Sequence, residues 1–160
     1  HPKVSEALGV LREHLDMDVV FVSQFHDHKR TFRVVEQRGD VAVLQAGHSD
    51  PVEESWCHHI AEGRAPQLMR DAARYVADGT VPNPGIPIGT HISAPVILAD
   101  GSVYGTLCCF SRDVKDGVSE MDLRRLQYTA NLLSDELLDS GVGAGPTVVF
   151  WIFVAGRERR

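Results

Sequence analysis

The chain has 160 residues, of which 43% are hydrophobic and 24% charged, and this length and composition fit one globular domain with a single core. Lysine and arginine number 16 against 22 acidic residues, so the formal net charge is −6, and a dense basic cluster occurs only at the extreme C-terminus. Because sequence-independent nucleic-acid binding needs clustered basic side chains, the composition argues against a nucleic-acid partner.

Cysteine usage and hydropathy indicate the compartment. The chain has three cysteines, which are Cys57, Cys108 and Cys109. Because their number is odd and two of them are neighbours in the sequence, they do not form a disulfide framework, and we expect a reducing, cytoplasmic setting. The apolar run at residues 148–155 is too short to span a bilayer and no signal-peptide pattern opens the chain, so no membrane association is expected. Because the chain begins with His1 and not with methionine, we expect it to be part of a longer protein that carries an output domain.

The first part of the chain predicts a helix, a hairpin and a second helix. Apolar residues at 4-3-4 spacing indicate an amphipathic helix over residues 3–15. The dense apolar run at residues 19–25 predicts a buried strand, and residues 31–36 follow a polar turn as its hairpin partner. A helix is expected over residues 50–63, because its aspartate can act as the cap and its proline suits the first helical position.

The second part predicts a short strand, a helical turn and an irregular proline-rich surface loop, over residues 67–69, 72–75 and 79–89. A second hairpin is expected over residues 91–98 and 103–111, joined by an Asp-Gly turn. A long helix should then run over residues 119–138, and residues 148–154 have strand composition without an obvious partner. Hairpins separated by helices imply an antiparallel sheet covered by helices, which is the α+β class.

The order of these motifs resembles that of the GAF family over residues 3–138. The stretches that carry the resemblance are LDMDVVFVS (15–23), ESWC (54–57), PQLMRDA (66–72), IGTHISAPV (88–96) and DGSVYGTLCCF (100–110). The chain is similar to GAF domains attached to bacterial signalling outputs such as histidine kinases, cyclic-di-GMP enzymes and transcription regulators. The resemblance implies a central antiparallel sheet, with the terminal helices on one face and the middle helices and loops around a ligand pocket on the other. We therefore expect a GAF-like sensory domain over residues 1–140 and a tail over residues 141–160.

Strand alternation places polar residues among apolar ones on the expected pocket face. Ser23 shares one face of its strand with aromatic residues, and His91 and Ser93 share one face of a later strand. Each such polar group needs a hydrogen-bond partner, which is backbone, water or a small organic ligand. The alternative to a ligand pocket is an ordinary core in which these polar groups are satisfied within the protein. For Asp71 the alternative role is that of a helix cap. The predicted ligand-binding residues are Phe21, Ser23, Phe25, Trp56, Cys57, Asp71, Tyr75, His91 and Ser93.

No specific cofactor is indicated by the motifs. His58 and His59 are adjacent, so on a helix their side chains diverge by about a hundred degrees and cannot both face one ion. The sequence also has no His-x-x-x-His or Cys-x-x-Cys spacing, so no metal site is predicted. The cysteine that anchors bilins in GAF photoreceptors is missing from residues 75–90, and the Asn-Lys…Phe…Asp-Glu signature of cyclic-nucleotide-binding members is not found. Nothing marks a haem ligand among the eight histidines, so the sequence leaves haem open and the ligand unidentified.

The alternative function is a thiol-dependent free methionine sulfoxide reductase, an enzyme that shares the GAF fold. In that family a cysteine follows a His-Ile-Ala stretch, and here Ala94 stands where that cysteine is expected. Cys108 and Cys109 lie in mid-strand and point to opposite faces, so both are predicted to be small core residues. We therefore predict a non-catalytic regulatory module that shows no turnover.

A symmetric homodimer is predicted from the two terminal helices. The apolar residues of the last helix recur at the 3-4-3-4 spacing of a heptad seam: Leu123, Leu126, Ala130, Leu133 and Leu137. The first helix carries a matching stripe: Val4, Leu8, Leu11 and Leu15. Covering the sheet accounts for part of this pattern, but Met121, Leu132 and Leu138 add apolar surface away from the seam. We expect the first and last helices of two chains to form a bundle.

Overall fold

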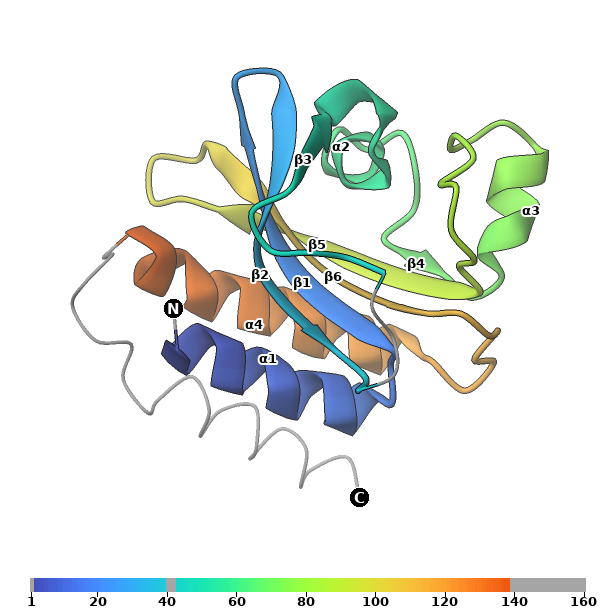
Figure 1. Cartoon of the computed structure of the whole chain (residues 1–160), viewed down its shortest axis with the longest axis horizontal. Coiled ribbons are helices and arrows are strands. Elements are labelled where there is room, and N and C mark those ends of the chain that lie inside the picture. The colour runs from blue at the N-terminus through green and yellow to red at the C-terminus, as the bar shows by residue number, and fades with distance from the viewer. Residues whose placement is uncertain (1, 40–42, 139–160) are drawn as a thin grey trace.

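A six-stranded antiparallel sheet forms the centre of the computed structural model, which describes residues 2–39 and 43–138 (Figure 1). The order across the sheet is β3-β2-β1-β6-β5-β4, and every neighbouring pair is antiparallel. The strands are β1 (Val19–His26), β2 (Lys29–Gln37), β3 (Ser49–Pro51), β4 (Leu68–Met69), β5 (Thr90–Ile97) and β6 (Val103–Ser111). The predicted α+β class and both predicted hairpins are confirmed.

Helices cover both faces of this sheet. The long terminal helices α1 (Pro2–Leu15) and α4 (Glu120–Leu138) lie side by side on one face (Figure 1). The 3-10 turn η1 (Val52–Glu54) and the short helix α2 (Trp56–Ala61) lie on the other, and α3 (Ala72–Ala77) lies beyond the β4 edge (Figure 1). The segment at residues 148–154 and the tail at 141–160 lie outside the described residues, so those two predictions stay untested.

The face covered by α1 and α4, called the helix face below, is a continuous apolar core. The strands β1, β5 and β6 supply its floor through alternate side chains: Val20, Val22, Ile92, Ala94, Val96, Leu107 and Cys109. The helices supply its cover: Val4, Leu8, Leu11 and Leu15 from α1, with Leu126, Ala130 and Leu133 from α4. Both sets of apolar residues therefore pack on the sheet of their own chain, so this described part of the predicted seam is not a free surface.

The opposite face of the same strands, called the cavity face below, has a different composition. Its side chains are Phe21, Ser23, His91, Ser93, Thr106, Cys108 and Phe110, all of them buried. Two smaller apolar clusters cover this face, one around Phe21 and Cys57 and one around Trp56 and Met69. Cys108 and Cys109 thus face opposite sides of the sheet, as predicted.

Two motif glycines are required where backbones approach closely. A β-carbon on Gly105 would lie 1.8 Å from the carbonyl oxygen of Ser23 on the neighbouring strand. A β-carbon on Gly89 would lie 2.2 Å from the backbone of Asp113. Both contacts are shorter than real β-carbon contacts allow, so any side chain at either position would force the backbones apart.

The predicted start of the second helix at Asp50 is wrong. Asp50 lies in β3, where its carboxylate pairs with Arg30 of β2, and a 3-10 turn follows. The α-helix begins only at Trp56, where the Ser55 hydroxyl accepts a hydrogen bond from the backbone N–H of His58 at 3.1 Å. Asp50 does not cap the helix because its carboxylate forms a tertiary ion pair with Arg30. The residue that caps the helix is Ser55, five positions later in the sequence.

Candidate functional site

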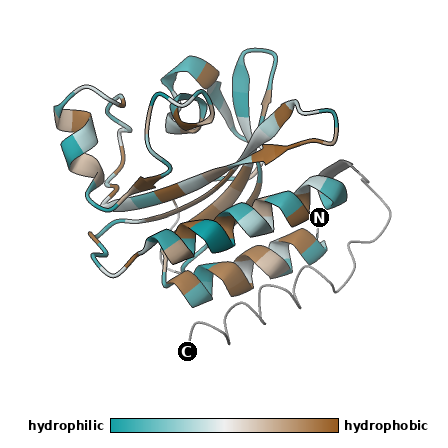
Figure 2. Cartoon of the chain, turned by 180° about the vertical axis from the view of Figure 1, so that it is seen from behind, coloured by the Kyte–Doolittle hydropathy of each residue, from teal (hydrophilic) through white to brown (hydrophobic). Residues whose placement is uncertain are grey.

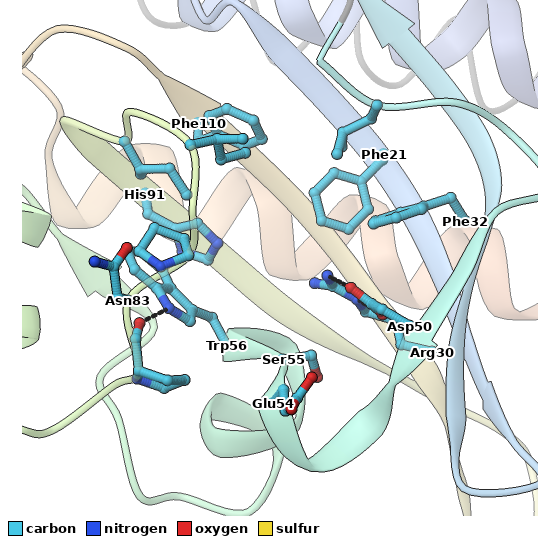
Figure 3. Close-up of a pocket in the computed structure, with 15 residues that line it drawn as sticks. Phe21, Arg30, Phe32, Asp50, Glu54, Ser55, Trp56, Asn83, His91 and Phe110 are labelled. Atoms are coloured by element: carbon cyan, nitrogen blue, oxygen red, sulfur yellow. Dashed lines mark hydrogen bonds and ion pairs between the residues drawn. The ribbon is translucent and has the colours of Figure 1, made fainter.

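A cavity of about 400 Å³ lies on the cavity face, between the sheet and the segment that contains η1 and α2 (Figure 3). Residues from β1, β2, β5 and β6 form its floor, and the loop around residues 82–88 closes its side. Its volume is in the range of small-molecule pockets, which hold roughly 300 to 1,000 Å³. The cavity therefore lies where the resemblance implies a ligand pocket.

Aromatic rings form one side of the cavity. Phe21 of β1 and Phe32 of β2 contact each other edge to face, with ring centroids 5.1 Å apart. The guanidinium of Arg30 lies over the Phe32 ring, 4.7 Å from its centroid, and Phe110 of β6 lines the floor (Figure 3). Aromatic rings present flat apolar surfaces, which suit a planar ligand.

The Arg30 side chain is a buried cation that is held in place by several partners. Its Nε donates to Oδ1 of Asp50 at 2.9 Å, and its Nη2 contacts the other carboxylate oxygen (Figure 3). Only 14% of the Arg30 side chain is exposed. Burial opposes its charge, but the nearby Cys57 and Asp50 outweigh this effect and raise the pKa of Arg30 above its ordinary value. The guanidinium is therefore always charged, and Asp50 compensates that charge.

Trp56 and His91 form the other side of the cavity (Figure 3). The indole Nε1 of Trp56 donates to the carbonyl oxygen of Pro82 at 2.7 Å, which fastens the loop to α2. The centroids of the Trp56 and His91 rings are 5.2 Å apart, and the angle between the ring planes is 65°. This contact joins α2, the loop and β5 around the same space.

His91 carries an unsatisfied buried nitrogen at the cavity wall. The residue is 3% exposed, and its Nδ1 has no hydrogen-bond partner among the described residues. Burial, and to a lesser extent the charge of Arg30, lower the pKa of His91 to about 3. The imidazole is therefore neutral at physiological pH. Because buried polar atoms are nearly always paired, this nitrogen marks a place for an additional hydrogen-bonding group.

A pair of thiols lies between α2 and β6, in contact with Arg30 but outside the cavity lining. The Sγ atoms of Cys57 on α2 and Cys108 on β6 are 3.3 Å apart, and both residues are completely buried. Arg30 Nη1 donates to Cys57 Sγ at 3.4 Å. Burial opposes ionisation of Cys57, but the hydrogen bond from Cys108 and the charge of Arg30 outweigh it and lower the pKa of the Cys57 thiol. Burial and the neighbouring Cys57 raise the pKa of the Cys108 thiol.

Three hydroxyl groups continue this network across the strands. The Ser93 hydroxyl lies 2.9 Å from Cys108 Sγ, which donates to Thr106 Oγ1 at 3.2 Å. Thr106 Oγ1 in turn lies 2.9 Å from the Ser23 hydroxyl. The polar groups that the sequence singled out on the strands are thus satisfied by side chains, and His91 Nδ1 is the exception.

The predicted site residues fall into three groups. Phe21, Trp56 and His91 line the cavity. Cys57, Ser93 and Ser23 are outside the lining and belong to the hydrogen-bonded network just described. The remaining three, which the cavity lining does not include, are Phe25, Asp71 and Tyr75.

The last group has local explanations. Phe25 contacts the ring of His58 at 6.1 Å near the end of the β1–β2 hairpin. Asp71 and Tyr75 line a separate depression beside α3, and Tyr75 packs in the Trp56 cluster. Asp71 stands at the N-terminus of α3 without a side-chain capping bond, so the capping explanation is wrong as well.

Sequence reasoning missed Arg30, Phe32 and Asp50. The run that contains Arg30 was interpreted as a polar turn, but the hairpin turn is only Asp27 and His28, both with positive φ. Arg30 and Phe32 are two residues apart, and this period-two spacing was the available signal for a shared strand face. Among the described residues, no group of three or more His, Cys, Asp or Glu side chains could hold a metal ion, and no helix is long and apolar enough to cross a membrane.

Comparison with solved structures places the fold among known proteins. A type II free methionine-R-sulfoxide reductase from Thermoplasma acidophilum has a TM-score of 0.68 at 15% identity, over 86% of this chain and 92% of that one. The GAF domain of an Acinetobacter phosphoenolpyruvate-protein phosphotransferase has a TM-score of 0.66 at 15% identity, over 84% and 80%. The blue-light absorbing form of the Thermosynechococcus elongatus PixJ GAF domain has a TM-score of 0.60 at 14% identity, over 86% and 86%. At these identities the likeness shows the fold alone.

Comparison with protein families and with curated proteins completes the assignment. No curated protein matches the chain. Residues 4–137 match the family described as GAF domain, which is most of the length and includes all six strands and nearly all of both terminal helices. The chain therefore belongs to the GAF domain family.

Proposed function

We propose that this domain is a non-catalytic sensor module and that its cavity binds a small planar organic molecule. The observation that carries the proposal is the unpartnered, buried Nδ1 of His91, a residue that is 3% exposed and lines an aromatic cavity of about 400 Å³. Leaving such a group unpaired costs about 1 to 3 kcal/mol, and a ligand that pairs with it recovers this free energy.

The charges around the cavity favour a neutral heteroaromatic ligand. Arg30 already faces two groups of its own chain, the Asp50 carboxylate and Cys57 Sγ, so these groups and not a ligand take up its charge. Glu54 adds a carboxylate to the lining. The neutral imidazole of His91 can donate or accept one hydrogen bond, and flat rings on both sides suit a planar molecule.

The test is a thermal-shift screen of neutral heteroaromatic metabolites, combined with native mass spectrometry of the purified domain. A binding compound should raise the melting temperature of the wild type, and His91→Phe should abolish that shift while the variant stays folded. His48→Gln, which changes an exposed histidine, is the matched control and should retain the shift. Absence of any stabilising compound, or an equal shift in His91→Phe, would overturn the proposal.

One observation favours the alternative of a methionine sulfoxide reductase. Cys57 and Cys108 are in contact, and a reductase of this kind is among the similar folds. Against this alternative, both thiols are completely buried and neither lines the cavity, so free methionine sulfoxide has no direct access to them. We expect no thiol-dependent turnover of free methionine sulfoxide; turnover that Cys57→Ser abolishes would establish the enzyme.

The signal is proposed to leave through α4 to an output domain in a larger, cytoplasmic bacterial signalling protein. His91 and Ile92 are neighbours on β5: one lines the cavity and the other packs in the core beneath α4. A ligand that shifts β5 therefore acts on the helix through a single packed layer. The three free, buried cysteines support a reducing compartment.

We also propose that the domain dimerises through the outer surfaces of α1 and α4. The apolar stripes of both helices pack on their own sheet, but Met121 and Tyr128 of α4 are each 50% exposed. They are seven residues apart and therefore lie on the same side of the helix. Figure 2 shows hydrophobic and hydrophilic residues mixed along both helices in the view from behind.

A further inference from the structure

We infer that Cys57 and Cys108 form a reversible dithiol–disulfide pair that small hydroperoxides oxidise. Their Sγ atoms are 3.3 Å apart although the residues are 51 positions apart in the chain and belong to α2 and β6. A disulfide bond has an S–S distance of about 2.05 Å, so bond formation needs a displacement of about 1 Å. A six-residue helix against a strand can provide this movement without a change of fold.

The third cysteine shows what a cysteine with only a packing role looks like in this protein. Cys109 faces the opposite side of the sheet, among apolar residues of the helix face, and has no polar partner in the described structure. Burial alone raises the pKa of its thiol. Cys57 and Cys108, in contrast, lie in a chain of polar contacts that includes a guanidinium and two hydroxyl groups.

These contacts assign different roles to the two thiols. The Arg30 guanidinium lies 3.4 Å from Cys57 Sγ and stabilises a thiolate there, which is the nucleophilic form. Cys108 keeps its proton, and its Sγ lies within hydrogen-bond distance of both Cys57 Sγ and Thr106 Oγ1. Cys57 is therefore the attacking thiol and Cys108 the resolving thiol.

The cavity supplies the route for the oxidant and limits its size. Arg30 lines the cavity with one part of its side chain and contacts Cys57 with its Nη1. A water-sized molecule in the cavity is thus separated from Cys57 by one side chain, whereas a peptide disulfide such as oxidised glutathione is too large to reach a completely buried sulfur. Hydrogen peroxide and small alkyl hydroperoxides meet this limit.

The reaction balances in two steps. The Cys57 thiolate attacks one oxygen of the hydroperoxide, the O–O bond breaks, and Cys57 becomes a sulfenic acid while the leaving oxygen departs as hydroxide or alkoxide and takes up a proton. Cys108 then attacks the sulfenic sulfur, the S–S bond forms and water leaves, so two thiols are oxidised by two electrons and one peroxide is reduced. An external dithiol returns both cysteines to thiols.

Oxidation changes the cavity through residues that already line it. The disulfide removes the thiolate that faces Arg30 and ties α2, which carries Trp56, to the floor strand. The redox state of the pair therefore changes the position and charge environment of residues in the cavity wall. This inference does not depend on a ligand in the cavity, so it can fail or hold independently of the proposed sensor function.

The test treats the full chain with hydrogen peroxide at neutral pH and follows intact mass, free thiols and peptide maps. We expect a loss of 2 Da, a decrease from three free thiols to one, a linked peptide pair containing Cys57 and Cys108, and full reversal by dithiothreitol. Cys109→Ala is the matched control and should form the same bond. Cys108→Ser should instead accumulate a Cys57 sulfenic acid that dimedone traps, and Arg30→Met should slow oxidation at least tenfold, with Arg30→Lys close to the wild type.

The peptide map of the wild type decides the question even if a variant fails to fold. A folded wild-type protein that keeps all three thiols, links only through Cys109 or between chains, or proceeds to sulfinic acid without the Cys57–Cys108 bond overturns the inference. Oxidation at equal rates by hydrogen peroxide and oxidised glutathione would overturn the assigned route through the cavity.

Discussion

The two faces of the sheet are made by the same strands but have opposite chemistry. On β5, Ile92 packs under α4 while its neighbour His91 carries an unpaired nitrogen at the cavity. On β6, Leu107 and Cys109 lie in the apolar core, and Thr106 and Cys108, which alternate with them, belong to the polar network. Strand alternation thus separates the two roles by one residue. The helix face stabilises the fold, and the cavity face carries the groups that are available for chemistry.

This division has an energetic reason. A cavity lacks packing contacts, and unpaired or charged buried groups cost free energy, so the cavity face contributes less stability per residue than a close-packed core. The long helices α1 and α4 compensate by burying complete apolar stripes. The domain can therefore hold a polar and loosely packed site because its other face is an ordinary, well-packed core.

The largest expected effect is a difference in stability between truncations on the two faces. Leu126→Ala removes a completely buried side chain from the helix face and should lower the free energy of unfolding by about 2 to 5 kcal/mol. Ile88→Ala removes a half-buried side chain that lines the existing cavity and should cost less than about 1.5 kcal/mol. Urea denaturation followed by circular dichroism measures both. Equal losses would show that the cavity face is packed as tightly as the core.

The next effect is the pH dependence that His91 contributes from the cavity face. The ordinary pKa of histidine is 6.5, and that of His91 is lowered to about 3 in the folded protein. Below pH 6.5 the unfolded chain therefore binds a proton at this residue that the folded chain does not, and stability falls as pH decreases towards 3. One such group changes the free energy of unfolding by about 1.4 kcal/mol per pH unit in this range.

The His91→Phe variant isolates this contribution. It should show a shallower loss of stability between pH 6 and pH 4 than the wild type, since phenylalanine keeps the ring against Trp56 but takes up no proton. Urea unfolding at several pH values measures the slope. His48→Gln should retain the wild-type slope, and identical slopes for His91→Phe and the wild type would contradict the neutral, buried state of His91.

The sequence predicts the scaffold better than the site. Strands and terminal helices follow from local spacing, so residues 103–111 were located to the residue and the last helix to within one position. The pair of Arg30 with Asp50 joins β2 to β3, and the contact of Cys57 with Cys108 joins α2 to β6, so neither leaves a local pattern. His91 was identified because its polarity interrupts an apolar strand, but its missing partner is visible only in three dimensions.

The smallest expected effect on stability concerns the outer surface of the helix face. The predicted heptad seam cannot test dimerisation, because Leu126 and Leu133 are completely buried against the sheet and their replacement would unfold the monomer. Met121 and Tyr128 are half exposed, so changing them leaves the core intact. The outer side of α4 therefore separates association from folding.

The double variant Met121→Lys, Tyr128→Lys should change the free energy of unfolding by less than about 0.5 kcal/mol. It should nevertheless convert the dimer to a monomer, because two lysines facing their symmetry-related copies place like charges in an apolar interface. Light scattering at high micromolar concentration gives the mass. Val114→Lys changes a residue that is 45% exposed in the loop before α4 and should leave the dimer unchanged. A monomeric wild type would contradict the dimer, and a double variant that stays dimeric would show that the chains associate through a surface other than the outer side of α4.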